Sequence, residues 1–445
     1  MNAAERAARY LDGVADRPVA PTGAMLARLP ELDHPLPEGA TDPAAVMRLL
    51  DEIGSPATVA SAGPRFFGFV IGGSLPAALA ANWLAGAWDQ NAGLRVMSPI
   101  AARLEEVTTG WLRHLLGLPD TTEAGFVTGA TMANFSGLAA ARQALLARQG
   151  WDVDARGLFD APPLTVVVGD EVHTSVLKAL SLLGLGRERV MRMPADGQGR
   201  LIADRLPALG DSSIVCLQAG NVNTGAFDPF PEICARARAA EAWVHVDGAF
   251  GLWAAAAPWR AHLATGLEAA DSWATDAHKW LNVPYDSGII FCRHPDALRA
   301  AMTLHRAAYL LQGEEREPYA YTPEASRRAR GLEVWAALRS LGRGGVADLV
   351  ERTCRLARRF ADRLSEAGHE VLNEVVLNQV LVSFGGPERT NRVIAGIQAE
   401  GTCWCGGTVW QGRTAMRISV SSWATTEADV DASVQAMLRV AKATG

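Results

Sequence analysis

The chain has 445 residues, of which 49% are hydrophobic and 20% are charged, and its formal net charge is −6. This apolar fraction supports a sizeable buried core and excludes intrinsic disorder, while the length predicts two or three domains or one large core with a smaller appendage. The acidic balance disfavours a nucleic-acid-binding protein, because the chain has no basic excess to neutralise phosphates.

The first sixty residues are rich in Pro and Ala and predict short helices at 3–11 and 43–53. The N-terminus mixes Arg and Glu with Ala and has no apolar region, so we expect no secretory signal. The apolar stretch 75–88 is too short and too polar for a membrane span, which needs about 20 apolar residues.

Six cysteines are scattered along the chain, and only Cys403 and Cys405 lie close together in the sequence. This pair lacks the further ligands that a zinc site requires, so we expect no metal. We favour free thiols in a reducing cytoplasm, and a redox role for the pair is the alternative.

Between residues 125 and 292, short apolar runs alternate with helical patterns, which indicates an α/β domain. The runs are continuous, as in strands that are buried on both faces of a mostly parallel sheet. We therefore predict such a sheet with helices on both faces. The predicted strands are 125–128, 164–169, 213–218, 243–247 and 288–292, and the predicted helices are 134–149, 174–183 and 231–240.

After residue 293 the pattern becomes helical, and a final block mixes short strands with a closing helix, which predicts a small α+β domain. The cluster of Arg327, Arg328 and Arg330 could form an anion site, but nearby glutamates favour a solvated helix face. The predicted helices are 323–340, 345–366 and one from Thr426, and the predicted strands are 371–374, 379–384 and 416–420.

Four features at predicted strand ends contain candidate functional residues, and the most distinctive is Lys279 between His278 and Trp280. A lysine close to a buried strand is costly unless its charge is removed or used. Its amine could form an imine with an aldehyde, most commonly pyridoxal 5′-phosphate (PLP), whereas an exposed surface lysine is the alternative.

Asp247 ends the predicted strand 243–247, at the edge where parallel sheets bind ligands. Its carboxylate could pair with the pyridine nitrogen of PLP, or it could cap the next helix. His173 also follows a predicted strand, and its flat ring could stack on a cofactor or serve as a structural hydrogen-bonding group.

The segment 128–134, which contains Gly129, Ala130 and Thr131, joins a predicted strand to a predicted helix. Free backbone N–H groups at a helix start form an anion site that suits a phosphate, and an ordinary helix cap is the alternative. Neither a Walker sequence nor a dinucleotide fingerprint is present.

These features occur in the order and spacing of one known architecture. The chain resembles the fold-type I PLP enzymes, and within them the group II decarboxylases, the glutamate, aromatic-amino-acid and histidine decarboxylase family. The resemblance runs from about residue 64 to the C-terminus. Further matching segments are Pro64-Arg-Phe-Phe-Gly, Met97-Ser98-Pro99, Gly225-Ala-Phe-Asp228-Pro, His278-Lys279-Trp280-Leu and Arg417-Ile-Ser-Val.

The resemblance implies which residues would contact PLP. Lys279 would form the imine, and Asp247 would bridge to the ring nitrogen. The two ring faces would pack against His173 and Ala249. The phosphate would be bound by Ala130, Thr131 and His278.

On the substrate side, the resemblance assigns Ser98 and Arg417, the latter at the start of a strand of the C-terminal domain. Relatives protonate the substrate carbon with a tyrosine on a mobile loop, which here begins near Tyr309 and is shorter. Tyr319 is the predicted donor and Tyr321 the reserve, although both could merely pack the loop. Without a donor, aldehyde formation is the expected outcome.

Two departures from the family pattern concern the pocket. Asp276 stands where relatives often carry Asn near the phosphate, and a carboxylate there would repel phosphate unless it is protonated or turned away. The segment 69–74, which lines the substrate entrance in relatives, is apolar here and favours an aromatic or apolar substrate side chain over glutamate.

We therefore expect a PLP-dependent decarboxylase that converts an L-amino acid to CO₂ and a primary amine. The alternatives are an aldehyde synthase, a lyase or an aminotransferase that uses the same pocket, and a non-catalytic PLP-binding protein. The resemblance implies a homodimer. The cysteines favour the cytoplasm, and the charge and the lack of a long apolar stretch favour no nucleic-acid or membrane partner. The expected parts are an N-terminal helical segment (1–60), a PLP-binding domain (61–305), a mobile loop with a connecting helix (306–345) and a small C-terminal domain (346–445).

Overall fold

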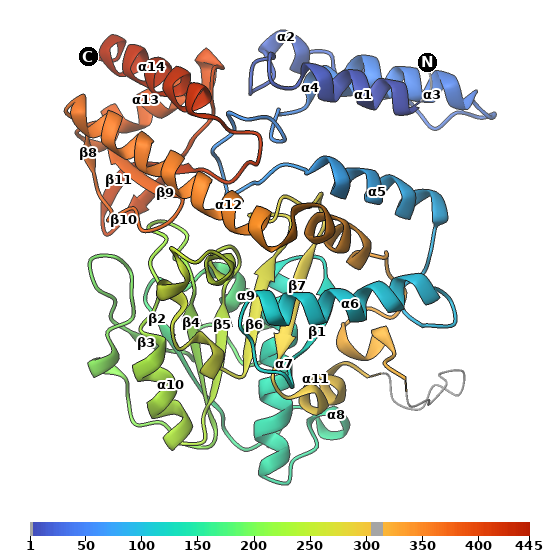
Figure 1. Cartoon of the computed structure of the whole chain (residues 1–445), viewed down its shortest axis with the longest axis vertical. Coiled ribbons are helices and arrows are strands. Elements are labelled where there is room, and N and C mark those ends of the chain that lie inside the picture. Colours follow the sequence, from blue (N-terminus) through green and yellow to red (C-terminus); the bar gives the residue numbers. More distant parts are fainter. Residues whose placement is uncertain (1–2, 304–314) are drawn as a thin grey trace. The chain divides into compact units, whose positions relative to one another are not determined.

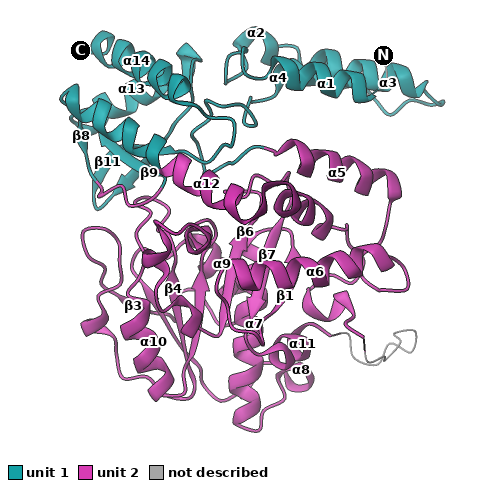
Figure 2. Cartoon of the chain, in the orientation of Figure 1, with its two compact units in different colours: residues 1–73, 355–372, 378–445 teal, residues 74–354, 373–377 magenta. Residues whose placement is uncertain are grey.

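The computed structural model describes residues 3–303 and 315–445 (Figure 1). The chain forms two compact units (Figure 2). The larger unit contains residues 74–354 and 373–377, and the smaller unit contains residues 1–73, 355–372 and 378–445. These limits differ from the predicted boundaries, because the N-terminal residues up to 73 cluster with the C-terminal segments. Tyr309 and the first part of the predicted mobile loop lie outside the described residues.

A seven-stranded, mostly parallel sheet forms the core of the larger unit, which confirms the predicted α/β class. The strand order is β1-β7-β6-β5-β4-β2-β3, and among the described strands of this sheet only β7 runs against its neighbours. The strands are β1 (Glu123–Val127), β2 (Thr165–Gly169), β3 (Met191–Met193), β4 (Ser213–Gln218), β5 (Trp243–Asp247), β6 (Ser272–Asp276) and β7 (Gly288–Cys292).

Strands β3 and β6 were not predicted from the sequence. Strand β3 has only three residues at an exposed edge of the sheet. Strand β6 is completely buried although it carries Ser272, Thr275 and Asp276. Internal hydrogen bonds permit this burial; for example, the Thr275 hydroxyl donates to the Gly248 carbonyl at 2.8 Å. The polar composition therefore hides a strand that lies in the core.

Helices flank this sheet (Figure 1). Helix α7 packs across β1, β5, β6 and β7. Gly137 permits its close approach, because a Cβ atom at this position would lie only 2.7 Å from the His245 ring. The helices of the unit before residue 303 are α5 (Pro76–Trp88), α6 (Pro99–Leu115), α7 (Ala130–Arg148), α8 (Val153–Arg156), α9 (Thr174–Leu182), α10 (Phe230–Ala239) and α11 (Pro295–Met302).

The long helix α12 (Gly331–Glu366) begins eight residues later than the sequence predicts. It joins the two predicted helices across a kink at Gly342, whose φ of 62° is left-handed. Residues 323–330 form bends and irregular chain, so the helical composition that starts at residue 323 does not produce a helix there.

The prediction of a solvated arginine face is wrong for Arg327 and Arg330, whereas the Arg328 side chain is 47% exposed. Arg327 pairs with Glu105 at 2.8 Å, and both side chains are 1% exposed. Arg330 pairs with Asp286 at 2.8 Å and is also buried. Buried charges require such partners, so these arginines fix the segment before α12 to the large unit.

The smaller unit contains a four-stranded antiparallel sheet of order β10-β11-β9-β8. Strand β10 was not predicted, because its Gly-Gly-Thr start carries no strand pattern. The elements of this unit are α1 (Ala3–Gly13), α2 (Gly23–Leu26), α3 (Pro43–Leu49), α4 (Ser55–Ala57), β8 (Glu370–Val371), β9 (Gln379–Ser383), α13 (Pro387–Glu400), β10 (Gly406–Trp410), β11 (Arg413–Ser419) and α14 (Glu427–Ala443).

Residues 61–73 were predicted to belong to the large domain, but they attach to the smaller unit. The Phe66 ring stacks on Trp404 with 5.0 Å between ring centroids. The Phe67 N–H donates to the Trp404 carbonyl at 2.8 Å, and the Phe67 carbonyl accepts from the Ser419 N–H at 2.9 Å. These contacts explain why the division falls at residue 73.

Across residues 3–303 and 315–445, no helix combines the length and apolar character that a membrane crossing requires. The same residues contain no cluster of His, Cys, Asp and Glu side chains that could hold a metal ion. All six cysteines, including Cys403 and Cys405, are buried free thiols.

Candidate active site

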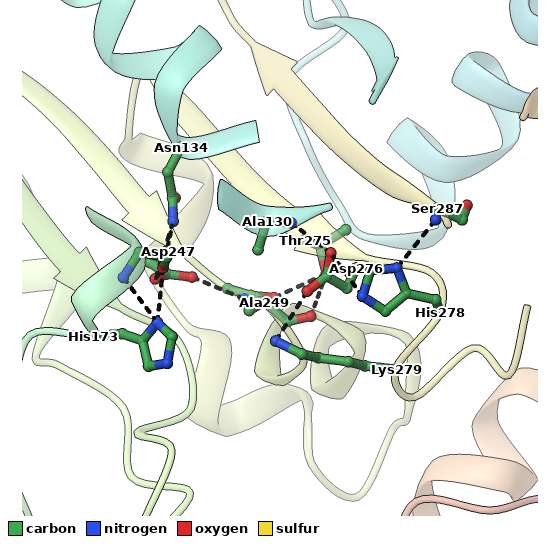
Figure 3. Close-up of polar contacts among 12 residues, drawn as sticks. Ala130, Asn134, His173, Asp247, Ala249, Thr275, Asp276, His278, Lys279 and Ser287 are labelled. Atoms are coloured by element: carbon green, nitrogen blue, oxygen red, sulfur yellow. Dashed lines mark hydrogen bonds and ion pairs between the residues drawn. The ribbon is translucent and has the colours of Figure 1, made fainter. Parts of the chain in front are cut away.

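The fold brings most of the predicted site residues to one edge of the large sheet. Asp247 and Asp276 are the last residues of the neighbouring parallel strands β5 and β6. His173 follows β2, and Ala130 begins helix α7 after β1. Figure 3 shows these residues together with Lys279, whose amine lies beside Asp276.

Asp247 is surrounded by neutral hydrogen-bond donors. Its Oδ2 accepts from Asn134 Nδ2 at 3.2 Å and from the Ser175 hydroxyl at 3.4 Å. Its Oδ1 accepts from the Ala249 N–H at 3.2 Å. Because Asp247 is only 5% exposed, these contacts replace the water that a carboxylate would otherwise bind.

A directed hydrogen-bond chain orients Asn134. The Trp243 indole, which can only donate, contacts Ser272 Oγ at 3.0 Å, and Ser272 Oγ lies 2.8 Å from His245 Nδ1. His245 Nε2 lies 2.9 Å from Asn134 Oδ1. Because the Asp247 carboxylate can only accept, the Asn134 NH₂ group faces it, and the amide oxygen faces His245 Nε2, which donates. The neutral imidazole then accepts the Ser272 hydroxyl proton at Nδ1, and this chain holds Asn134 in place.

His245 is neutral in this chain of contacts. It is fully buried in β5, and burial lowers its pKa to about 4, although the nearby Asp247 opposes the shift. The sequence analysis did not identify His245 or Asn134 as site residues. The only available signal was a histidine two positions before the strand-end aspartate.

His173 is held by a helix cap. Its Nδ1 accepts the Ser175 N–H at 3.2 Å and lies 2.8 Å from Ser175 Oγ, which makes it the N-cap of α9. The structural alternative that was considered for this residue is therefore present. The cap fixes the ring beside Asp247, because Ser175 contacts both residues.

Asp276 has charged and dipolar partners. Its Oδ1 accepts the Ala130 N–H at the start of α7 at 2.6 Å, and its Oδ2 lies 2.9 Å from Lys279 Nζ. The Nε2 atom of His278 is 3.5 Å from Asp276 Oδ1. Asp276 is thus seated in the anion cradle that was predicted at the start of this helix.

His278 is fixed from two sides. Its Nδ1 accepts the Ser287 N–H at 3.1 Å, and its ring stacks on Tyr285 with 4.3 Å between centroids. Burial is the main cause that lowers the pKa of His278, so the neutral ring is favoured. Tyr285, which was not identified from the sequence, lies in the same β6–β7 connection as Lys279 and remains 56% exposed.

Three other predicted site residues are Ser98, Arg417 and Thr131. Ser98 is fully buried and caps α6 by accepting the Ala101 N–H at 3.4 Å. Arg417 belongs to the smaller unit, where it is the fifth residue of β11, so the prediction that it starts a strand is wrong. Burial lowers its pKa. Thr131 occupies the second position of α7, next to Ala130.

Tyr319 and Tyr321 are packed in a short 3₁₀ helix, η7 (Pro318–Tyr321), so this part of the predicted mobile loop is ordered and buried. The Tyr319 N–H donates to the Gly93 carbonyl at 2.9 Å, and burial raises the pKa of Tyr319. The Arg316 guanidinium lies 4.1 Å from the centre of the Tyr321 ring. Both side chains join the hydrophobic core around α7 and α11.

Comparison with known proteins places the chain in a family. Residues 28–385 match the family model described as the pyridoxal-dependent decarboxylase conserved domain. The chain belongs to this family. As a pyridoxal-dependent decarboxylase, it is a carboxy-lyase that uses PLP.

Relatives of this pyridoxal-dependent decarboxylase differ in substrate. The chain is 27% identical to an aromatic-L-amino-acid decarboxylase of Bacillus atrophaeus, over 76% of this chain and 70% of the relative. It is 31% identical to an L-2,4-diaminobutyrate decarboxylase of Rhizobium meliloti (strain 1021), over 80% and 72%. The fold matches the crystal structure of Oryza sativa TDC with PLP and tryptamine at a TM-score of 0.90, with 23% identity over 99% and 96% of the two chains.

The geometry of the site fits PLP. The Ala130 N–H already holds a carboxylate oxygen at 2.6 Å, which shows that the helix start accepts an anion. At Gly129 a Cβ atom would lie 3.1 Å from the His278 ring and 3.4 Å from Asp276 Oδ1, so a side chain there would crowd the cradle. Lys279 offers the amine and Asp247 the buried carboxylate. When bound, PLP supplies an electron sink for the negative charge that departing CO₂ leaves on the substrate.

Proposed function

We propose that this pyridoxal-dependent decarboxylase converts an L-amino acid with an aromatic or apolar side chain to CO₂ and a primary amine. The buried Asp247, which accepts three hydrogen bonds and lies on the same sheet edge as Lys279, carries the proposal. A carboxylate held in this way can keep a proton on a pyridine nitrogen, which makes the bound ring a strong electron acceptor.

We assign one task to each group of residues. Lys279 carries the cofactor, and Asp247 holds the ring nitrogen. His173 and Ala249 pack on the two ring faces. The phosphate binds Ala130, Thr131 and His278, and the substrate carboxylate binds Arg417 with help from Ser98. The contacts of Asp247, His173 and Ala130 support their roles, whereas Arg417 and Ser98 rest on the family resemblance.

The preference for an aromatic or apolar side chain rests on the apolar segment 69–74, which lines the substrate entrance in relatives and whose Phe69 is 61% exposed. A flat aromatic group can pack on such a surface. The test is a screen of the standard amino acids for CO₂ and amine production by the PLP-loaded enzyme. Turnover of an aromatic or apolar amino acid is expected. Exclusive turnover of diaminobutyrate or acidic amino acids would contradict the preference.

Tyr319 remains our predicted proton donor, with Tyr321 second. The test is the product of Tyr319→Phe. Loss of amine with new aldehyde supports the assignment, because an unprotonated carbanion can react with oxygen instead. Unchanged amine formation would show that Tyr319 only packs the core, and Tyr321→Phe would then be tested in the same way. A keto acid or aldehyde from the unmodified enzyme would favour the alternative PLP reactions.

We also propose a homodimer, as the family resemblance implies. Exposed apolar side chains gather on and beside helices α5 and α6, and such surfaces mark interaction sites. They are Trp83, Leu84, Trp88, Val96, Met97, Ile100 and Trp111. Light scattering at micromolar concentration should give twice the 47.3 kDa chain mass, whereas a monomer would contradict this proposal. The six free cysteines support a reducing compartment such as the cytoplasm.

A further inference from the structure

The anion cradle at the start of α7 is occupied by a side chain of the protein itself. Asp276 Oδ1 accepts the Ala130 N–H at 2.6 Å, and Oδ2 pairs with Lys279 at 2.9 Å. The side chain of Asp276 is 2% exposed, so its charge is balanced by these partners and hardly by water. The helix start and the lysine are also the two groups that a phosphorylated aldehyde needs.

The backbone around Asp276 is fixed, so only its side chain can leave the cradle. Its N–H donates to the Ala249 carbonyl at 2.8 Å, and its carbonyl accepts from the Trp253 indole at 3.1 Å. The start of β7 also packs closely against the cradle, because a Cβ atom at Gly288 would lie only 2.4 Å from the Gly129 Cα. The cradle therefore has little freedom to widen around both anions.

We infer that Asp276 is an internal competitor for the phosphate cradle, and that it must give up Ala130 and Lys279 when PLP loads. The inference rests on the assignment of PLP to this site. A carboxylate and a phosphate carry charge of the same sign, and each is attracted by the same N–H group. The phosphate group of PLP consequently adds less affinity in this chain than the empty cradle would give.

The test compares PLP with pyridoxal, which has the same aldehyde but no phosphate. Absorbance titrations of cofactor-free enzyme give both dissociation constants for the unmodified chain and for Asp276→Asn. This isosteric change removes the charge and leaves an amide oxygen for the Ala130 N–H. Any effect through Lys279 alters both ligands, whereas an effect through the cradle alters only PLP.

In Asp276→Asn we expect PLP affinity to rise about tenfold or more relative to pyridoxal affinity, the upper part of the range for charges at helix ends. Inorganic phosphate should also compete with PLP at lower concentration. Asp296→Asn, which removes an equal charge from a side chain that is 88% exposed, should leave the affinity ratio unchanged.

An unchanged or reduced ratio in Asp276→Asn would overturn the inference, since Asp276 would then help to hold the phosphate or would not meet it. Circular dichroism checks that the variant folds, and Asp276→Ser provides a second neutral variant if it does not. If neither PLP nor pyridoxal changes the absorbance of the unmodified chain, the assignment of PLP has failed, and this outcome is separate from a failure of the competition.

Discussion

Two buried carboxylates end neighbouring strands of one sheet, but their surroundings differ. Asp247 is held by an amide, a hydroxyl and a backbone N–H, all of them neutral. Asp276 is held by an ammonium group and a helix start. Neutral donors satisfy a charge without cancelling it, so Asp247 keeps its charge available to a ligand. The partners of Asp276 are themselves the groups that we propose for cofactor binding, so the proposal requires that these contacts be exchanged.

The largest expected effect is the loss of activity when the charge of Asp247 is removed. Asp247→Asn keeps the shape but removes the charge that holds a proton on the ring nitrogen. We expect kcat to fall by at least about a thousandfold, or about 4 kcal/mol in activation free energy, far beyond any loss of PLP binding. Steady-state CO₂ release and PLP titration measure the two effects. Substantial decarboxylation by this variant would contradict the proposed role.

The next effect tests the neutral surroundings of Asp247 through pH. The pKa of His245 is about 4 in the fold against 6.5 for the ordinary group, so between these values the unfolded chain binds a proton that the folded chain does not. Stability is therefore lost as pH falls from about 6.5 to about 4, by about 3 kcal/mol at the lower end. Urea unfolding across this pH range measures the loss.

The control for this prediction is a comparison of variants. Burial raises the pKa of Asp228 to about 6, which gives a stability that decreases as pH rises and so opposes His245. Asp228 contributes equally to the unmodified chain and to His245→Gln, so it cancels when their free energies of unfolding are subtracted at each pH. His262→Gln, at an exposed histidine, is the matched control variant. Parallel pH profiles for the unmodified chain and His245→Gln would show that His245 does not carry the effect.

The smallest effect concerns orientation. Asn134→Ala removes one donor to Asp247 and leaves the His245 N–H without its acceptor. We expect kcat to fall about tenfold, in keeping with about 1–2 kcal/mol for one lost hydrogen bond. Gln143→Ala on the same helix is the control. A loss as large as that of Asp247→Asn would mean that Asn134 does more than position the carboxylate.

Most of the strands could be predicted, and candidate site residues could be proposed, because their signals are local. A continuous apolar run indicates a buried strand, and Asp247 and His173 each follow such a run. Strand β6 lacked this signal, since the hydroxyls of Ser272 and Thr275 are satisfied only by residues from other strands and loops. The pattern of apolar residues along the sequence therefore predicts a buried strand only where the buried side chains are apolar.

The rest of the site depends on distant pairings. Asn134 and His245 are 111 residues apart, and helix α7 packing across β5 is what joins them. Tyr319 depends on distant pairings too, because the loop sequence left open both a proton donor and a packing residue, and its burial involves residues from other elements. Ser98 was assigned by motif, and its observed role is to cap a helix.

Strand β7 runs against its neighbours, and this reversal determines how Lys279 is attached. Parallel neighbours need a long crossover, whereas β6 and β7 are joined by residues 277–287 alone. The N–H groups of Ala277 and His278 both donate to the Ser287 carbonyl, at 3.0 and 3.2 Å, and so close this loop at its base. A short closed loop has little conformational entropy to lose. The reactive amine is therefore carried by a tether that folds with its two strands, independently of the longer connections on the faces of the sheet.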